Sequence, residues 1–233
     1  MNLLIITGAS SGIGLAIAQQ FSGNGWRVIN ISRRPCPEAA VINLTCDLAE
    51  PDAVLALQPA LELELTAAKR ICLVHNASVM HFHPIDGLPA TDLRRVLELN
   101  LVAANTLNQL VIPHQGAASS VIYIGSTLAE KAVPGVASYV IAKHALVGMM
   151  RATCQDLAGR GIHTCMICPG VTDTQQVRDL LASNPDLLAA FTALSAFNRL
   201  IEPAEIAAAV AFAAQAPVLN GAVIHANLGQ RER

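Results

Sequence analysis

The stretch Thr7-Gly8-Ala9-Ser10-Ser11-Gly12-Ile13-Gly14 decides the fold of this 233-residue chain. It follows the apolar run Asn2–Thr7, which predicts a first strand, and it opens a helical pattern over Gly12–Gly23. The three glycines permit a tight turn and a close approach of the backbone to a ligand. The free N–H groups at the start of the helix favour phosphate there. The stretch therefore predicts a dinucleotide site at a strand-to-helix turn.

Short apolar runs alternate with helical stretches along the rest of the chain. Further strands are expected at Arg27–Ile31, Val41–Thr45, Arg70–His75, Ser120–Gly125, Ile162–Ile167 and Ala222–Ala226. Further helices are expected in the fifties and at Thr91–Ile112, Ser138–Gly159 and Pro203–Ala214. The alternation predicts one α/β domain over residues 1–233, a doubly wound Rossmann fold with a mostly parallel seven-stranded sheet and helices on both faces.

Residues 171–202 interrupt this rhythm. The segment follows Pro169-Gly170 at the end of an expected strand, and Asn184-Pro185 breaks its helical pattern. Open α/β sheets bind ligands at the carboxyl ends of their strands. We expect a lid over a substrate here, with an ordinary helical excursion as the alternative.

The composition excludes several classes of partner. A net charge of −2 gives no electrostatic reason to bind nucleic acid or an anionic membrane surface. No apolar run approaches the roughly 20 residues of a membrane span. The six cysteines are scattered through expected strands and helices, which suits a reducing cytoplasm. A cytoplasmic protein without nucleic acid or membrane partners is expected.

The end of the second expected strand favours one cofactor over another. An NAD site usually places an acidic residue on the ribose hydroxyls at this point. This chain has Ser32 there, followed by Arg33 and Arg34. An arginine fork suits a 2′-phosphate, and no carboxylate stands there to repel it. NADP(H) is therefore favoured over NAD(H), the alternative being two solvated arginines on a loop.

Asp47 follows the third expected strand, in Thr45-Cys46-Asp47-Leu48. Its carboxylate could accept a hydrogen bond from the adenine amino group of a dinucleotide. It could equally be the N-cap of the next helix. The sequence leaves both interpretations open.

Tyr139 and Lys143 indicate the chemistry. Residues four apart on a helix share a face, so the phenol and the ammonium point into the same space. A nearby positive charge favours the phenolate and lowers the pKa of a tyrosine. With the dinucleotide turn, the pair predicts hydride transfer in which tyrosine donates or accepts the proton.

These motifs, in this order along the chain, resemble those of the short-chain dehydrogenase/reductase family. The resemblance is to the compact, single-domain branch of that family, which includes the 3-oxoacyl-[acyl-carrier-protein] reductases. The T-G-x-x-x-G-x-G of the family is similar to Thr7–Gly14, and its Y-x-x-x-K to Tyr139–Lys143. Its N-A-G appears as Asn76-Ala77-Ser78, with serine in place of glycine. Its P-G-x-x-x-T matches Pro169, Gly170 and Thr174.

The resemblance implies a role for each matched residue. Tyr139 would be the general acid or base, Lys143 would hold the nicotinamide ribose, and Ser126 would hydrogen-bond the carbonyl oxygen. Asn100 would hold a water that links Lys143 to solvent. Cofactor contacts are implied at Gly8, Ser10, Ser11, Gly12, Ile13, Gly14, Ser32, Arg33, Arg34, Asp47, Leu48, Asn76, Ala77, Ser78, Tyr139, Lys143, Pro169, Gly170, Val171 and Thr174.

The expected function is an NADP(H)-dependent oxidoreductase that moves hydride between the nicotinamide and a small-molecule ketone or alcohol. An aliphatic or acyl substrate is slightly favoured, because aromatic residues make up only 3% of the chain. The alternative is a catalytically silent dinucleotide-binding regulatory protein of the same fold. The resemblance also implies a homotetramer or homodimer that packs through Thr91–Ile112 and Ser138–Gly159.

His81-Phe82-His83 follows the fourth expected strand. Two histidines two residues apart could bind a metal, but no partner carboxylate or third ligand is evident in the sequence. A pocket wall or a solvated loop is the favoured interpretation, and no metal site is expected.

Overall fold

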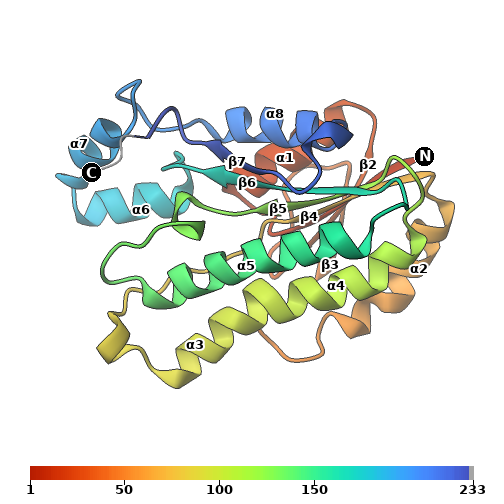
Figure 1. The fold of residues 1–233 in the computed structure, drawn as a ribbon, viewed down its shortest axis with the longest axis horizontal. Helices are drawn as coiled ribbons and strands as arrows, with labels where there is room; N and C mark the ends of the chain where they lie inside the picture. Colours follow the sequence, from red (N-terminus) through yellow and green to blue (C-terminus); the bar gives the residue numbers. More distant parts are fainter. Residues whose placement is uncertain (231–233) are drawn as a thin grey trace.

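The computed structural model describes residues 1–230. Its seven strands are all parallel and form one sheet in the order β3-β2-β1-β4-β5-β6-β7 (Figure 1). The strands are β1 (Asn2–Thr7), β2 (Arg27–Ser32), β3 (Val41–Thr45), β4 (Arg70–His75), β5 (Ser120–Ile124), β6 (His163–Pro169) and β7 (Val223–Ala226). The doubly wound fold is confirmed, and each expected strand lies within two residues of its predicted ends.

The helices are α1 (Gly12–Gly23), α2 (Gln58–Ala67), α3 (Ala90–Leu97), α4 (Ala103–Val111), α5 (Ala137–Asp156), α6 (Gln175–Ser183), α7 (Leu187–Leu194) and α8 (Pro203–Ala213). The helix predicted in the fifties was misplaced. Only a 3-10 turn at Leu55–Leu57 precedes α2, because Asp52 adopts a φ of 60°, which is incompatible with a right-handed helix. The helix predicted over Thr91–Ile112 is α3 and α4 joined by a π-helical segment, η3 (Glu98–Val102).

The two faces of the sheet are covered by different helices. α1 and α8 pack together on one face, while α2, α4 and α5 cover the other (Figure 1). In β1, Leu4 and Ile6 belong to the core under α1 and α8, and Leu3 and Ile5 belong to the opposite core. Burial on both faces explains why the sequence of this strand is continuously apolar instead of alternating.

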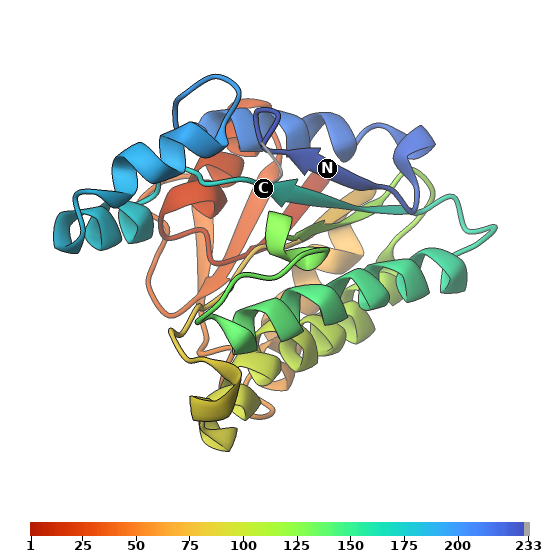
Figure 2. The ribbon, with the colours of Figure 1, turned by 60° about the vertical axis from the view of Figure 1, so that its left-hand side comes forward.

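The segment 171–202 contains α6 and α7, neither of which buries a residue. Backbone hydrogen bonds tie its two ends together, from Asp173 N to the carbonyl of Ile201 (2.8 Å) and from Ile201 N to the carbonyl of Val171 (3.0 Å). Both views place α6 and α7 at one end of the molecule, apart from the other helices (Figures 1 and 2). The segment thus leaves the sheet and returns to it at one point.

Within residues 1–230, no helix combines the length and the apolar character that crossing a membrane requires. The six cysteines are free thiols, and Cys165 and Cys168 are buried within β6.

Candidate active site

The glycine turn lies where the chain leaves the centre of the sheet. β1 and β4 are neighbours, and the chain continues from them to opposite faces of the sheet. This switch point is where open α/β sheets bind nucleotides. Gly8 and Gly12 have φ values of 73° and 57°, which strongly favour glycine. A Cβ on Gly14 would collide with the carbonyl oxygen of Gly8, so the helix can approach the turn only with glycine at this position.

The start of α1 is open to an anion. Ser11 is the N-cap residue, and its side chain makes no capping hydrogen bond. The first N–H groups of α1 therefore have no side-chain cap within the described residues. A Cβ on Gly12 would lie 3.1 Å from Cγ2 of Thr174, so the segment between β6 and α6 faces the turn. These features fit the pyrophosphate of a dinucleotide.

Two buried polar residues, to which the sequence analysis assigned no role, shape this turn. The hydroxyl of Thr7 accepts hydrogen bonds from Asn76 N (3.0 Å) and Ala77 N (2.9 Å), which joins β1 to the end of β4. Oδ1 of Asn30 accepts from Ala9 N at 2.9 Å, although Asn30 lies inside β2 and is buried. A polar residue within a buried strand is the signal that could have identified Asn30, because such a group must be hydrogen-bonded.

The end of β2 presents two cations. Arg33 and Arg34 are exposed, and within residues 1–230 no carboxylate forms an ion pair with either. The hydroxyl of Ser32 is held inside the turn, donating to the carbonyl of Arg34 and accepting from Nδ2 of Asn30. Both guanidinium groups are therefore available to a ligand at this edge.

Asp47 caps a turn and not a helix, so the helix N-cap interpretation is wrong. Its Oδ1 accepts a hydrogen bond from Ala49 N (3.0 Å), and its Oδ2 lies 3.2 Å from Arg95. The first helical turn after β3 begins only at Leu55. The contact with adenine stays a prediction.

Three of the catalytic candidates lie just after the carboxyl end of β5 and near the start of α5. The Nζ of Lys143 lies 5.5 Å from the centre of the Tyr139 ring, which confirms that the two residues share a helix face. The hydroxyl of Tyr139 forms a hydrogen bond with Ser126, which follows β5. Lys143 is only 2% exposed, and it donates to the carbonyl of Ile124 at 2.9 Å.

Burial controls the protonation of the pair. It raises the pKa of Tyr139, and the hydrogen bond with Ser126 offsets only part of that rise. The neighbouring lysine was expected to lower the pKa of this tyrosine, but the net shift is upward, because burial opposes ionisation more strongly than the hydrogen bond with Ser126 favours it. Burial also lowers the pKa of Lys143 to about 8, against a smaller opposing effect of Cys168. At neutral pH the phenol therefore keeps its proton and the ammonium is charged.

Asn100 lies in η3, which packs against α5. It is 4% exposed, its Nδ2 donates to the carbonyl of Val96 (2.9 Å), and its Oδ1 accepts from the hydroxyl of Ser78 (2.9 Å). Both polar atoms of the side chain are thus engaged, which fixes its orientation.

Most of the predicted residues gather at the carboxyl ends of the strands β1, β4, β5 and β6. Gly170 donates to the carbonyl of Ala226 (3.2 Å), and the hydroxyl of Thr174 caps α6 by accepting from Val177 N. Arg33, Arg34 and Asp47 lie after β2 and β3, on strands remote in the sheet order from β5 and β6. An extended dinucleotide would cross between these two groups.

Comparisons with known proteins agree with this geometry. The family model described as enoyl-(acyl carrier protein) reductase matches residues 8–231. The chain is 30% identical to L-fucose dehydrogenase of Bos taurus, covering 91% of this chain and 82% of that protein. It is 27% identical to the 3-oxoacyl-[acyl-carrier-protein] reductase of Vibrio cholerae, covering 97% and 95% of the two chains.

Solved structures give the same result. The ligand-free aldohexose dehydrogenase of Thermoplasma acidophilum superposes with a TM-score of 0.90 at 28% identity, covering 98% of this chain and 93% of that one. A 3-oxoacyl-(acyl-carrier-protein) reductase of Agrobacterium tumefaciens with NADP bound superposes with a TM-score of 0.87 at 26% identity, with the same coverage. The sheet order, the glycine turn and these likenesses agree, and the chain belongs to the short-chain dehydrogenase/reductase family of nicotinamide-dependent oxidoreductases.

Proposed function

We propose that this protein is an NADP(H)-dependent carbonyl reductase in which Tyr139 is the general acid. The observation that carries the proposal is the arrangement of three residues. A half-buried, protonated Tyr139 forms a hydrogen bond with Ser126 and lies one helical turn from a buried Lys143. A phenol held in this way can donate a proton to a carbonyl oxygen.

The bound dinucleotide would supply hydride to the carbonyl carbon. Tyr139 Oη would give its proton to the carbonyl oxygen, leaving a phenolate. The charged ammonium of Lys143, on the same helix face, would stabilise that phenolate. When a substrate binds, the hydroxyl of Ser126 would turn its hydrogen toward negative charge on the substrate oxygen, while its own oxygen still accepts from Leu128 N (3.1 Å).

The preference for NADP(H) is supported by the end of β2. Arg33 and Arg34 are exposed there, and Ser32 stands where an acidic residue would repel a 2′-phosphate. A similar solved structure, the reductase of Agrobacterium tumefaciens, has NADP bound.

The segment 171–202 is proposed as a lid over the substrate. Neither α6 nor α7 buries a residue, and the apolar side chains of Leu188 and Phe197 are exposed. The backbone hydrogen bonds of Ile201 hold the base of the segment beside the end of β6. Closure over an aliphatic or acyl substrate would bury apolar surface and exclude water from the reacting groups.

Two or four copies are proposed to pack through α4 and α5. Ile141, Ala145, Gly148 and Ala152 are exposed at helical spacing along one side of α5, and Val102 is exposed beside α4. Such an apolar face is suited to packing against the same face of a second copy of the chain.

The test follows NADPH oxidation by the purified protein against a panel of carbonyl compounds, led by an acetoacetyl thioester. Tyr139→Phe is expected to keep NADPH affinity and to lose nearly all turnover, because it removes only the acidic hydroxyl. Tyr123→Phe is the matched control, since Tyr123 is buried in β5 and its hydroxyl is bonded to Asn108 (2.9 Å) and Thr153 (2.9 Å) and not to Ser126. That variant is expected to lose stability but to keep its turnover number.

Two results would overturn the proposal. Normal turnover by Tyr139→Phe would remove the tyrosine from the mechanism. NADPH binding without turnover across the whole panel would favour the alternative of a silent dinucleotide-binding regulatory protein.

A further inference from the structure

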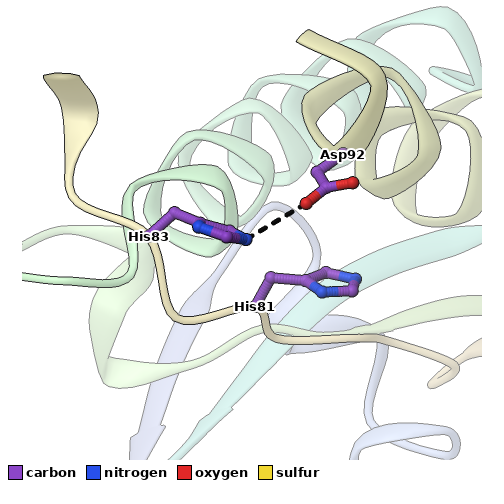
Figure 3. Close-up of side chains that lie close together, drawn as sticks. All are labelled: His81, His83 and Asp92. Carbon is purple, nitrogen blue, oxygen red and sulfur yellow. Dashed lines mark ion pairs between the residues drawn. The ribbon is translucent and has the colours of Figure 1, made fainter. Parts of the chain in front are cut away.

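A second group of polar side chains lies where the loop after β4 meets the first turn of α3. Figure 3 shows the side chain of His83 directed toward Asp92, with His81 beside them. One potential ligand atom from each lies within 4.8 Å of the others, and all three residues are half-buried. The Nε2 of His83 is 3.1 Å from Oδ2 of Asp92, and the two imidazole rings stack with centres 6.4 Å apart.

The local backbone explains why the histidines converge. In extended chain, side chains alternate between two sides, so His81 and His83 share one side. Phe82, between them, points away and is 61% exposed. The sequence revealed no carboxylate partner for this pair, and that expectation was wrong. The fold supplies Asp92, nine residues beyond His83, from the first turn of α3.

We propose that His81, His83 and Asp92 form a binding site for a divalent first-row transition metal of the zinc class. Two imidazoles and one carboxylate are borderline-soft ligands that such ions prefer, with a fourth position left for water. Ligands on tetrahedral zinc are about 3.4 Å apart when bonds are about 2.1 Å long. The 3.1 Å between Nε2 of His83 and Oδ2 of Asp92 is close to that value, and rotation of the His81 side chain would bring the third ligand in.

The site would be coupled to the start of α5. The carbonyl oxygen of His83 accepts a hydrogen bond from Ala137 N (3.1 Å), and His83 forms a β-bridge with Val136. Ala137 begins α5 two residues before Tyr139. A bound ion would therefore join the loop, α3 and the start of α5, and it is expected to raise the unfolding temperature of the protein.

The test titrates the untagged full-length chain with Zn²⁺ by calorimetry and with Co²⁺ by absorption, in a buffer with a non-thiol reductant and with NADP⁺ present. One equivalent is expected to bind, with the visible bands of cobalt on nitrogen and oxygen ligands and an increase in unfolding temperature. His81→Ala, His83→Ala and Asp92→Asn are each expected to weaken binding at least about tenfold, since each removes one ligand. The control is His114→Gln, because His114 pairs with a carboxylate, Glu62, at 3.6 Å, and no third ligand joins them among residues 1–230.

Three outcomes would overturn the assignment. One is no binding by the wild-type chain at micromolar ion, which would make His83 and Asp92 an ion pair only. A second is equal weakening by His114→Gln. The third is a sulfur-to-cobalt charge-transfer band that persists in His83→Ala, which would place the ion on a cysteine.

Discussion

The hydroxyl of Ser78 donates a hydrogen bond of 2.9 Å to Oδ1 of Asn100, and this contact joins the segment after β4 to η3. Ser78 stands where the N-A-G motif of related enzymes carries glycine, so the contact depends on the residue that departs from that motif. Since Nδ2 of Asn100 is held by the carbonyl of Val96, Ser78 supplies the hydrogen bond to the other polar atom of this side chain.

Replacing Ser78 with alanine is expected to lower the free energy of unfolding by about 1 kcal/mol, the usual contribution of one hydrogen bond. Chemical denaturation of both proteins measures this difference. Ser183→Ala is the control, because the hydroxyl of Ser183 donates to the carbonyl of Asp179 within its own exposed helix (3.3 Å). Equal stability of the Ser78 variant and the wild type would mean that water replaces the hydroxyl without loss.

Arg33→Ala is expected to weaken NADPH binding about tenfold or more and NADH binding little. A charge-assisted hydrogen bond to the 2′-phosphate contributes about 1.5–3 kcal/mol, and only NADPH carries that phosphate. Fluorescence titration with both cofactors measures the two affinities. Lys69→Ala removes an exposed cation just before β4, at the amino ends of the strands, and should change neither affinity. Equal losses for the two cofactors would defeat the assignment.

Lys143→Met is expected to abolish turnover without destabilising the fold at pH 7. Burial lowers the pKa of Lys143 from 10.5 to about 8, so keeping this ammonium charged in the folded protein costs about 3 kcal/mol. The substitution leaves the carbonyl of Ile124 without its donor, which costs about 1 kcal/mol and is the smaller effect.

The same shift predicts a pH dependence of stability. Between pH 8 and 10.5 the unfolded chain binds more protons at Lys143 than the folded chain, so the lysine becomes less destabilising as pH rises. The stability advantage of Lys143→Met over the wild type should therefore shrink by about 3 kcal/mol from pH 7 to pH 10.5. Denaturation curves at several pH values test this, and a constant difference would contradict the lowered pKa.

Gly148→Trp is expected to produce a folded monomer. A Cβ at Gly148 would meet no atom within 4 Å, so the subunit itself has room for the side chain, while a twin packed on α5 would not. Light scattering after size-exclusion chromatography gives the mass of the variant. Gly116→Trp is the matched control, since its position is equally open but lies in the loop before β5. An unchanged oligomer in Gly148→Trp would place the interface elsewhere.

Local sequence features predicted most of the framework correctly. The apolar run of β1 followed by Gly8, and the spacing of Tyr139 and Lys143, predicted a nucleotide turn and a shared helix face. Such features depend on backbone geometry within a few residues, which is why a pattern can reveal them. The helix expected in the fifties failed because a local break at Asp52, with its positive φ, displaced the start of α2.

The sequence alone determined the order of the strands and helices, the turn that suits a dinucleotide and the tyrosine and lysine proposed as the proton-transfer pair. Only the tertiary structure decided the protonation of that pair, since burial by surrounding elements raises the pKa of Tyr139 and lowers that of Lys143. It also decided that Asp92 meets His83 and that Ser78 meets Asn100. These properties depend on groups far apart in the chain, and their desolvation and contacts exist only after the sheet and helices have packed.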